Sequence, residues 1–285
     1  MITRRNLMIA TGAAALTATC EPLWSETTKR KVRISACDWS IGKRGSIDAV
    51  ALGKKIGLDA IEASFGAPGG SADLRDDKIK KQYRDACKKH QMQLSSLAMG
   101  VLNGVPFSSD PRTVQWVSDA IDAAAAMKLN VILLAFFGKG DIRGKKDLTA
   151  EVIRRFKKLA PKAEKAGVTL GIESWLSAEE HMHIIDSVGS KSVQVYYDVA
   201  NSNKMGYGIY KELRLLGKKG VVCQVHCKEN GYLLGHGRID FKKVRAALDS
   251  FNYPGWLTIE SAVPRGKPMF DAYVHNQKFL RAVFS

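Results

Sequence analysis

Eight short apolar and β-branched runs, separated by amphipathic stretches of helical length, are the feature that most constrains the fold of this 285-residue chain. Such runs are typical of buried strands, and a helix between successive strands is typical of a parallel sheet. The predicted strands lie within residues 31–39, 58–65, 93–101, 130–138, 168–175, 192–201, 221–229 and 256–261. The predicted helices lie near residues 46–57, 76–91, 111–128, 150–166, 178–188, 208–218, 241–251 and 271–284.

This alternation runs from residue 31 to residue 285 without a linker or a break in composition. Eight strands that each precede a helix predict a single (β/α)8 TIM barrel. Start signals support two helices: Asp110 and Pro111 suit the N-cap and the first helical position, and Ser177 with Glu180 can form a capping box. An open doubly wound sheet would need a glycine-rich phosphate-binding turn after the first strand, which residues 36–45 do not supply.

The first residues have the pattern of an export signal. Arg4 and Arg5 precede a run of apolar and small residues that is too short to span a membrane. We predict a twin-arginine signal at residues 1–26, with cleavage anywhere from about Ala18 to Glu26, and therefore a periplasmic protein without a membrane span. Lipid anchoring at Cys20 is not expected, because Thr17 stands where such a signal carries leucine.

The chain carries a formal net charge of +16, and its lysines and arginines are spread over the predicted helices. This distribution indicates a basic outer surface rather than a specific nucleic-acid groove. The four cysteines after Cys20 form no CxxC pair, which argues against a structural zinc site and leaves any disulfide pairing open. The oligomeric state is open as well, a homo-oligomer included.

Four consecutive predicted strands end in residues that can bind a metal: Glu173, Asp198, His226 and Glu260. Functional side chains of a TIM barrel lie at the carboxyl ends of its strands, so these four should converge at one side of the barrel mouth. Side chains alternate along a strand. The residues two positions earlier should therefore also face the interior, namely Gly171, Tyr196, Gln224 and Thr258. The residues between them should face the helices, namely Ile172, Tyr197, Val225 and Ile259.

Three carboxylates and an imidazole in one place favour the binding of a cation, because the carboxylates repel one another without it. Three oxygen donors and one nitrogen donor suit Mn²⁺ best, with Mg²⁺, Co²⁺ and Zn²⁺ as alternatives. We therefore predict one divalent metal held by Glu173, Asp198, His226 and Glu260.

The chain resembles the sugar isomerases and epimerases with a xylose isomerase-like barrel, a family that includes ketose 3-epimerases and inosose dehydratases. The resemblance covers essentially residues 31–285 and is carried by the motifs GIES, YYDVAN, VHCKE, GLDAIEAS and GHGRIDFKKVRAALDSFNYPGWLTIES. It implies that the four strand-end residues bind a divalent metal. It also implies that Glu173 and Glu260 are the acid and base of the reaction.

Removal of a proton next to a ketone leaves an enediolate, which a metal stabilises as a Lewis acid. Two carboxylates can remove that proton and return one. Epimerisation, isomerisation and dehydration all start this way, so the expected activity is a sugar isomerase or epimerase, with a lyase or dehydratase acting on a keto-sugar or inosose as the alternative. A non-catalytic exported sugar-binding barrel is a third hypothesis. An apurinic endonuclease fits less well, because its metal cluster needs several strand-end histidines.

A small keto-sugar or polyol is the expected ligand. The predicted substrate contacts are Glu62, Lys228, His236 and Arg238 for its oxygens and Trp39 and Trp175 for stacking on its apolar face. Ketose epimerases carry histidine three residues after the metal-binding aspartate, where this chain has Asn201. Asn201 is therefore a further predicted substrate contact, and the change favours a modified, oxidised or glycoside-derived sugar over a free ketohexose.

Overall fold

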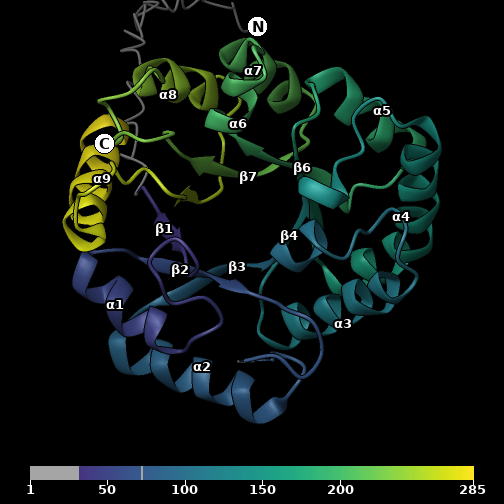
Figure 1. Cartoon of the computed structure of the whole chain (residues 1–285), viewed down its shortest axis with the longest axis horizontal. Coiled ribbons are helices and arrows are strands. Elements are labelled where there is room, and N and C mark those ends of the chain that lie inside the picture. The colour runs from purple at the N-terminus through teal and green to yellow at the C-terminus, as the bar shows by residue number, and fades with distance from the viewer. Residues whose placement is uncertain (1–31, 72) are drawn as a thin grey trace, which may run out of the picture. The chain divides into compact units, whose positions relative to one another are not determined.

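The computed structural model describes residues 32–71 and 73–285. Eight parallel strands in this range form a closed barrel in sequence order, with β8 hydrogen-bonded to β1 (Figure 1). The strands are β1 (Ile34–Cys37), β2 (Ala60–Ser64), β3 (Gln93–Met99), β4 (Val131–Phe136), β5 (Thr169–Ser174), β6 (Val193–Asp198), β7 (Val222–Cys227) and β8 (Leu257–Ile259). The predicted TIM barrel is confirmed.

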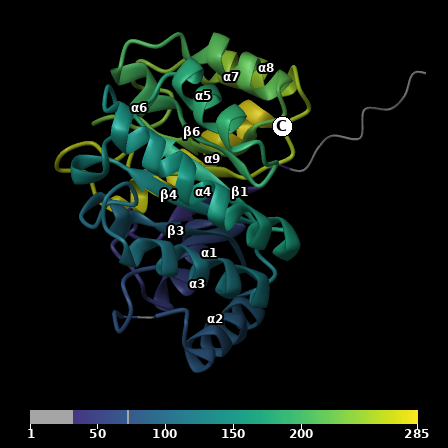
Figure 2. The same cartoon turned by 90° about the vertical axis from the view of Figure 1, so that its right-hand side faces the viewer.

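The helices surround the strands as an outer layer, and in the side view α3 and α4 lie in front of the strands (Figure 2). Helix α3 contacts β3 and β4, and α4 contacts β5. The α-helices are α1 (Asp48–Ile56), α2 (Asp77–His90), α3 (Arg112–Ala126), α4 (Lys146–Ala166), α5 (Ala178–Val188), α6 (Val199–Lys204), α7 (Ile209–Lys218), α8 (Phe241–Asp249) and α9 (Met269–Phe284). Two short 3-10 helices, η1 (Gly100–Asn103) and η2 (Gly138–Gly140), follow β3 and β4. No helix of the described residues is both long and apolar enough to cross a membrane.

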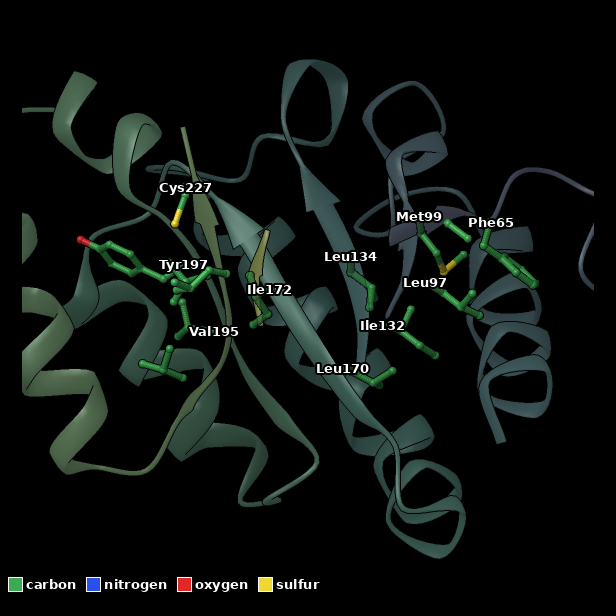
Figure 3. Packing of buried hydrophobic residues seen from close by; sticks show 14 of the residues in the cluster. Phe65, Leu97, Met99, Ile132, Leu134, Leu170, Ile172, Val195, Tyr197 and Cys227 are labelled. Atoms are coloured by element: carbon green, nitrogen blue, oxygen red, sulfur yellow. The ribbon is translucent and has the colours of Figure 1, made fainter. Parts of the chain in front are cut away.

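The main hydrophobic core lies between the strands and the helices. Figure 3 shows side chains of this layer, among them Leu97 and Met99 of β3 and Ile132 and Leu134 of β4. The predicted outward-facing residues all belong to it, namely Ile172, Tyr197, Val225 and Ile259. Alternation along the strands therefore leaves the other residues of β5 to β8 to face the interior of the barrel.

The barrel interior is filled by a hydrogen-bonded polar layer. The Gln224 side-chain nitrogen lies within hydrogen-bond distance of three hydroxyl oxygens, 2.7 Å from Tyr196 Oη, 2.9 Å from Thr258 Oγ1 and 2.9 Å from Ser96 Oγ. Gly171 leaves room for this layer, since a Cβ at that position would lie 2.7 Å from Cys223 Sγ and 3.1 Å from Tyr196 Cβ. This layer lies directly beneath the strand-end residues in the barrel interior.

The last helix closes the ring, because α9 lies next to α1 (Figure 1). Arg281 of α9 forms an ion pair with Asp59 at 3.1 Å and donates to the carbonyl oxygen of Gly57 at 3.0 Å. Asp59 in turn accepts from the backbone N–H of Ile34 at 2.9 Å, at the start of β1. These contacts fix the end of the chain beside its first strand.

Some elements differ from the predicted ones, and α4 for example begins four residues earlier than expected, at Lys146. The short helix α6 was not predicted; it begins directly after β6 because the Asp198 side chain accepts from the backbone N–H groups of Ala200 and Asn201. Helix α3 begins at Arg112, one residue later than expected, although the Asp110 carboxylate does accept from the Arg112 N–H. The predicted capping box of Ser177 and Glu180 is confirmed.

The predicted export signal and Cys20 lie outside the described residues, so both remain predictions. The four cysteines within the described range, Cys37, Cys87, Cys223 and Cys227, are free thiols.

His181 at the start of α5 is a buried neutral imidazole. Its Nδ1 lies 2.9 Å from the carbonyl oxygen of Ser177, which can only accept, so Nδ1 donates and Nε2 accepts from Ser174 Oγ at 2.9 Å. Burial lowers the pKa of His181 from 6.5 to about 4. Between these values the unfolded chain binds a proton that the folded protein does not, so this contribution to stability is complete above pH 6.5 and is lost toward pH 4.

We therefore predict that His181→Gln destabilises the protein by about 1–3 kcal/mol near neutral pH, through lost buried hydrogen bonds. The difference from wild type should shrink by about 2 kcal/mol between about pH 7.5 and pH 4.5. Urea unfolding across this pH range measures it. His183→Gln, at an exposed position of the same helix, is the control and should leave the pH dependence of wild type unchanged. A destabilisation by His181→Gln that is independent of pH would contradict the assignment.

Candidate metal centre

The structure brings together the four strand-end residues Glu173, Asp198, His226 and Glu260, with one donor atom of each within 4.8 Å of the others. His226 Nδ1 lies at the centre, 3.0 Å from Glu173 Oε1, 3.5 Å from Glu260 Oε2 and 3.9 Å from Asp198 Oδ2. The convergence follows from the barrel, because β5 to β8 are adjacent and parallel and end at the same rim.

Asp198 has one oxygen that is satisfied and one that is not. Its Oδ1 caps α6, whereas Oδ2 is buried and has no hydrogen-bond partner in the described part of the chain. A buried carboxylate oxygen without a donor costs free energy unless a cation or a proton binds it. The nearest cationic groups are Lys228 Nζ at 3.5 Å and His226. This oxygen, which accepts no hydrogen bond, lies within 4.8 Å of the other three donors, so the donor set fits a divalent metal.

Glu260 is held on both carboxylate oxygens. Trp39 Nε1 donates to Oε1 at 3.1 Å, and Lys228 Nζ donates to Oε2 at 2.8 Å. The two residues that follow, Ser261 and Ala262, have φ angles of 58° and 56°, in a region that non-glycine residues rarely occupy. The chain thus turns sharply away after Glu260 and leaves its side chain at the barrel mouth.

Glu62 lies below the cluster of the four strand-end residues Glu173, Asp198, His226 and Glu260. Its Oε2 is 2.9 Å from His226 Nε2 and 3.2 Å from Cys37 Sγ, and its Oε1 accepts from Ser96 Oγ at 2.8 Å. His226 Nε2 faces this carboxylate, which leaves Nδ1 directed at the cluster. The predicted sugar contact is corrected accordingly: β2 continues to Ser64, so Glu62 points inward one layer below the rim and is fully buried.

The environments shift the pKa values of these groups in different directions. Burial raises the pKa of Glu173 to about 7 and also raises that of Asp198. Burial acts on Glu260 as well, but the nearby Lys228 and His226 outweigh it and lower the pKa of Glu260 to about 2. A divalent cation among these carboxylates would favour the ionised form of each.

A cavity of about 300 Å³ opens above the cluster. Glu173 and Glu260 line it, together with four of the predicted substrate contacts: Trp39, Trp175, Asn201 and Lys228. Sequence reasoning missed the rest of the wall, which comprises Arg44, Ser64, Gly100, Asn103, Leu133, Ala135 and Phe137. All of these come from β1 to β4 or the segments after them, where no strand ends in a recognisable metal ligand. Their one available signal is their position on a strand or in the segment that follows it.

His236 and Arg238 do not line this cavity. Both lie in an exposed segment between β7 and α8. The Leu234 N–H donates to Asn276 Oδ1 of α9 at 3.0 Å, and the His236 ring lies 5.1 Å from that of His275 on the same helix. The segment is thus held against α9.

Comparison with known proteins agrees with this architecture. The model of the xylose isomerase-like TIM barrel family matches residues 50–283. The chain belongs to this family. A curated relative, the 2-epi-5-epi-valiolone 7-phosphate 2-epimerase of Actinoplanes sp., is 25% identical over 177 residues, which are 61% of this chain and 64% of the relative. The chain thus spans somewhat less than two thirds of the length of that protein.

Solved structures with the same fold include several sugar epimerases. The D-psicose 3-epimerase of Clostridium cellulolyticum H10, solved with D-tagatose, superposes with a TM-score of 0.76 and 17% identity over 89% of this chain and 100% of the other. The 3-keto-D-glucoside 4-epimerase from E. coli superposes with a TM-score of 0.70 and 17% identity, over 88% of this chain and 100% of the other. An L-ribulose 3-epimerase superposes with a TM-score of 0.73 and 19% identity, over 89% of this chain and 94% of the other. At these identities the likeness establishes the fold.

If Glu62 orients His226 toward the cluster, Glu62→Gln should weaken metal binding without removing a ligand. We expect the Kd for Mn²⁺ to rise about 10- to 100-fold, as for other partners of metal-binding histidines. Competition with a metal-sensitive dye measures the Kd. Glu212→Gln is the matched control, because this carboxylate accepts comparable hydrogen bonds from Tyr197 Oη and the Ala178 N–H outside the barrel. Equal Mn²⁺ affinities for wild type and Glu62→Gln would refute the role of Glu62.

Proposed function

We propose that this protein is a divalent-metal-dependent sugar epimerase or isomerase that transfers a proton at carbon next to a carbonyl group. The observation that carries the proposal is the buried Asp198 Oδ2, which accepts no hydrogen bond from the described residues and lies with Glu173, His226 and Glu260 in one cluster of donor atoms. The same four residues would hold the metal, with Mn²⁺ as the best match to three carboxylates and an imidazole. When bound, the metal would act as a Lewis acid that stabilises the charge developing as the proton leaves.

The two glutamates are placed to act as the acid and base. Strands β5 and β8 are separated by β6 and β7 in the barrel, so Glu173 and Glu260 reach the cavity from different sides. A sugar held between them can lose a proton to one carboxylate and regain one from the other, which inverts the carbon. Trp39 and Lys228 fix both oxygens of Glu260, so this group is oriented before the sugar arrives.

The cavity walls suit a sugar. Trp175 packs edge-on against Phe137, with ring centroids 5.1 Å apart, and both line the cavity. They offer an apolar surface in a cavity that polar groups such as Asn201 and Asn103 also line, a mixture that suits the apolar faces and hydroxyl groups of a sugar.

The names of the relatives support this class of reaction. The curated relative and the solved structures above are described as epimerases, and one of the latter acts on a 3-keto-D-glucoside. A keto-sugar or keto-polyol is accordingly the substrate class of the proposal, with dehydration as the alternative outcome of the same first step. A periplasmic location is also part of the proposal, and it rests on the twin-arginine signal predicted from the sequence.

Deuterium exchange tests the proposal directly. Incubation of the Mn²⁺-loaded protein in D₂O with keto-sugars, including 3-keto sugars and inososes, should put deuterium on carbon next to the carbonyl, as mass spectrometry and NMR detect. Glu173→Gln and Glu260→Gln, each saturated with Mn²⁺, should lower the rate of exchange by about 10²- to 10⁴-fold, since each removes a proton-transfer group.

Glu164→Gln, at an exposed position of α4, is the control and should retain the rate of wild type. Loss of water from the product would identify a dehydratase. A ligand that binds tightly without any exchange of carbon-bound hydrogen would show a sugar-binding barrel instead of an enzyme.

A further inference from the structure

Arg44 lines the cavity, but it is not part of the metal cluster or of the proton transfer. It lies in the segment between β1 and α1 and is exposed at the cavity mouth. Its Nη1 lies beside Gly100, 3.6 Å from where a Cβ of that residue would stand. Its guanidinium carbon is 5.9 Å from the centre of the Trp39 ring. The cation is therefore directed at the cavity from the side of β1 and β3.

A buried aspartate fixes the backbone on both sides of Arg44. The Asp38 carbonyl oxygen accepts from the Lys43 N–H at 2.8 Å, and Asp38 Oδ2 accepts from the Gly45 N–H at 2.9 Å. The same carboxylate accepts from the backbone N–H of Ser64 at 2.8 Å and from Ser64 Oγ at 2.6 Å, which joins the segment to the end of β2. Arg44 is thus presented from a rigid turn, although its side chain is exposed.

Within the described residues, Arg44 makes no hydrogen bond or ion pair. The other basic side chains at this end of the barrel differ. Lys228 pairs with Glu260, and Arg143, which lies 4.8 Å from the centre of the Trp175 ring, is held by Asp141 through a two-pronged contact. The guanidinium of Arg44 is the one charged group of the described cavity wall that has no partner of opposite charge.

Arg44 lies outside the ion pairs of the site. Among the described residues, Glu260 pairs with Lys228, and Glu62 and Glu173 contact His226. Arg44 instead stands at the cavity mouth, where Trp39 separates it from the reaction centre. The indole N–H of Trp39 donates to Glu260 while its ring lies beneath Arg44. A ligand whose reacting end reaches Glu260 would therefore bring its remote end toward Arg44.

We propose that Arg44 forms a subsite for an anionic substituent, a carboxylate or a phosphate, at the end of the substrate remote from the reacting carbons. Guanidinium groups bind such oxyanions through two parallel hydrogen bonds, which combine charge with orientation. This inference rests on the proposed function, because the reacting end of the sugar is placed at Glu260. It narrows the substrate class to acidic keto-sugars.

Calorimetric binding of three ligands to the Mn²⁺-loaded protein at physiological salt tests the subsite. The ligands are D-fructose, its keto-uronate D-fructuronate and D-fructose 6-phosphate. Wild type should bind the uronate or the phosphate at least tenfold more tightly than fructose, and whichever of the two is preferred identifies the substituent. Arg44→Gln should abolish the preference and leave the affinity for fructose unchanged. Arg238→Gln removes the same charge from an exposed position outside the cavity and should retain the preference.

Equal binding of all three ligands by wild type, or a preference that persists in Arg44→Gln, would overturn the subsite. Loss of the preference in Arg238→Gln would also overturn it, because the general basicity of the protein would then explain the effect. Failure of the proposed function is distinguishable. If binding shows a preference that depends on Arg44 but no ligand exchanges deuterium, the subsite stands and the proposed epimerase is refuted. If a neutral ketose exchanges deuterium but no ligand is preferred, the epimerase stands and the subsite is refuted.

Discussion

The hydrogen bond between His226 and Glu62, two fully buried side chains, connects the barrel interior to its functional end. A buried carboxylate is costly unless it is paired, and Glu62 is paired on both oxygens, with His226 and Cys37 on one and Ser96 on the other. Ser96 in turn accepts from Gln224 of the polar layer. The orientation of His226, and with it the position of Nδ1 among the carboxylates, therefore depends on residues that no ligand in the cavity contacts.

The barrel divides its tasks between two sides. Strands β5 to β8 supply the groups proposed to bind a metal and to transfer protons, whereas β1 to β4 and the segments after them supply Trp39, Arg44 and much of the cavity wall. Trp39 joins the two sides, since its N–H orients Glu260 while its ring faces Arg44. The residues for the proposed reaction and those that would recognise the remote end of a substrate can thus change independently. This is expected for a TIM barrel, in which the loops vary while the strands are retained.

The sequence was sufficient for the barrel and for the convergence of the four strand-end residues, because strand periodicity and parallel order together determine where side chains meet. It was not sufficient for Glu62, whose layer depends on β2 running on to Ser64. The sequence did not predict α6 either, because Asp198 both ends β6 and caps α6, and only its position at the strand end was recognised. The role of Arg44 could not be predicted either, because nothing in the local sequence distinguishes it from the other 43 basic residues. Its position at the cavity depends on the hydrogen bond of Asp38 to Ser64 at the end of β2, which is distant in sequence.

Glu173, Asp198, His226 and Glu260 are proposed to form one divalent-metal site. Elemental analysis of protein purified without chelator, before and after incubation with Mn²⁺, measures the metal content of this site. We expect one divalent metal per chain in wild type and in His236→Ala, and little or none in His226→Ala, which removes the central donor. A wild-type protein that holds no metal even after incubation, or a His226→Ala variant that holds as much as wild type, would show that these four residues do not form a metal site.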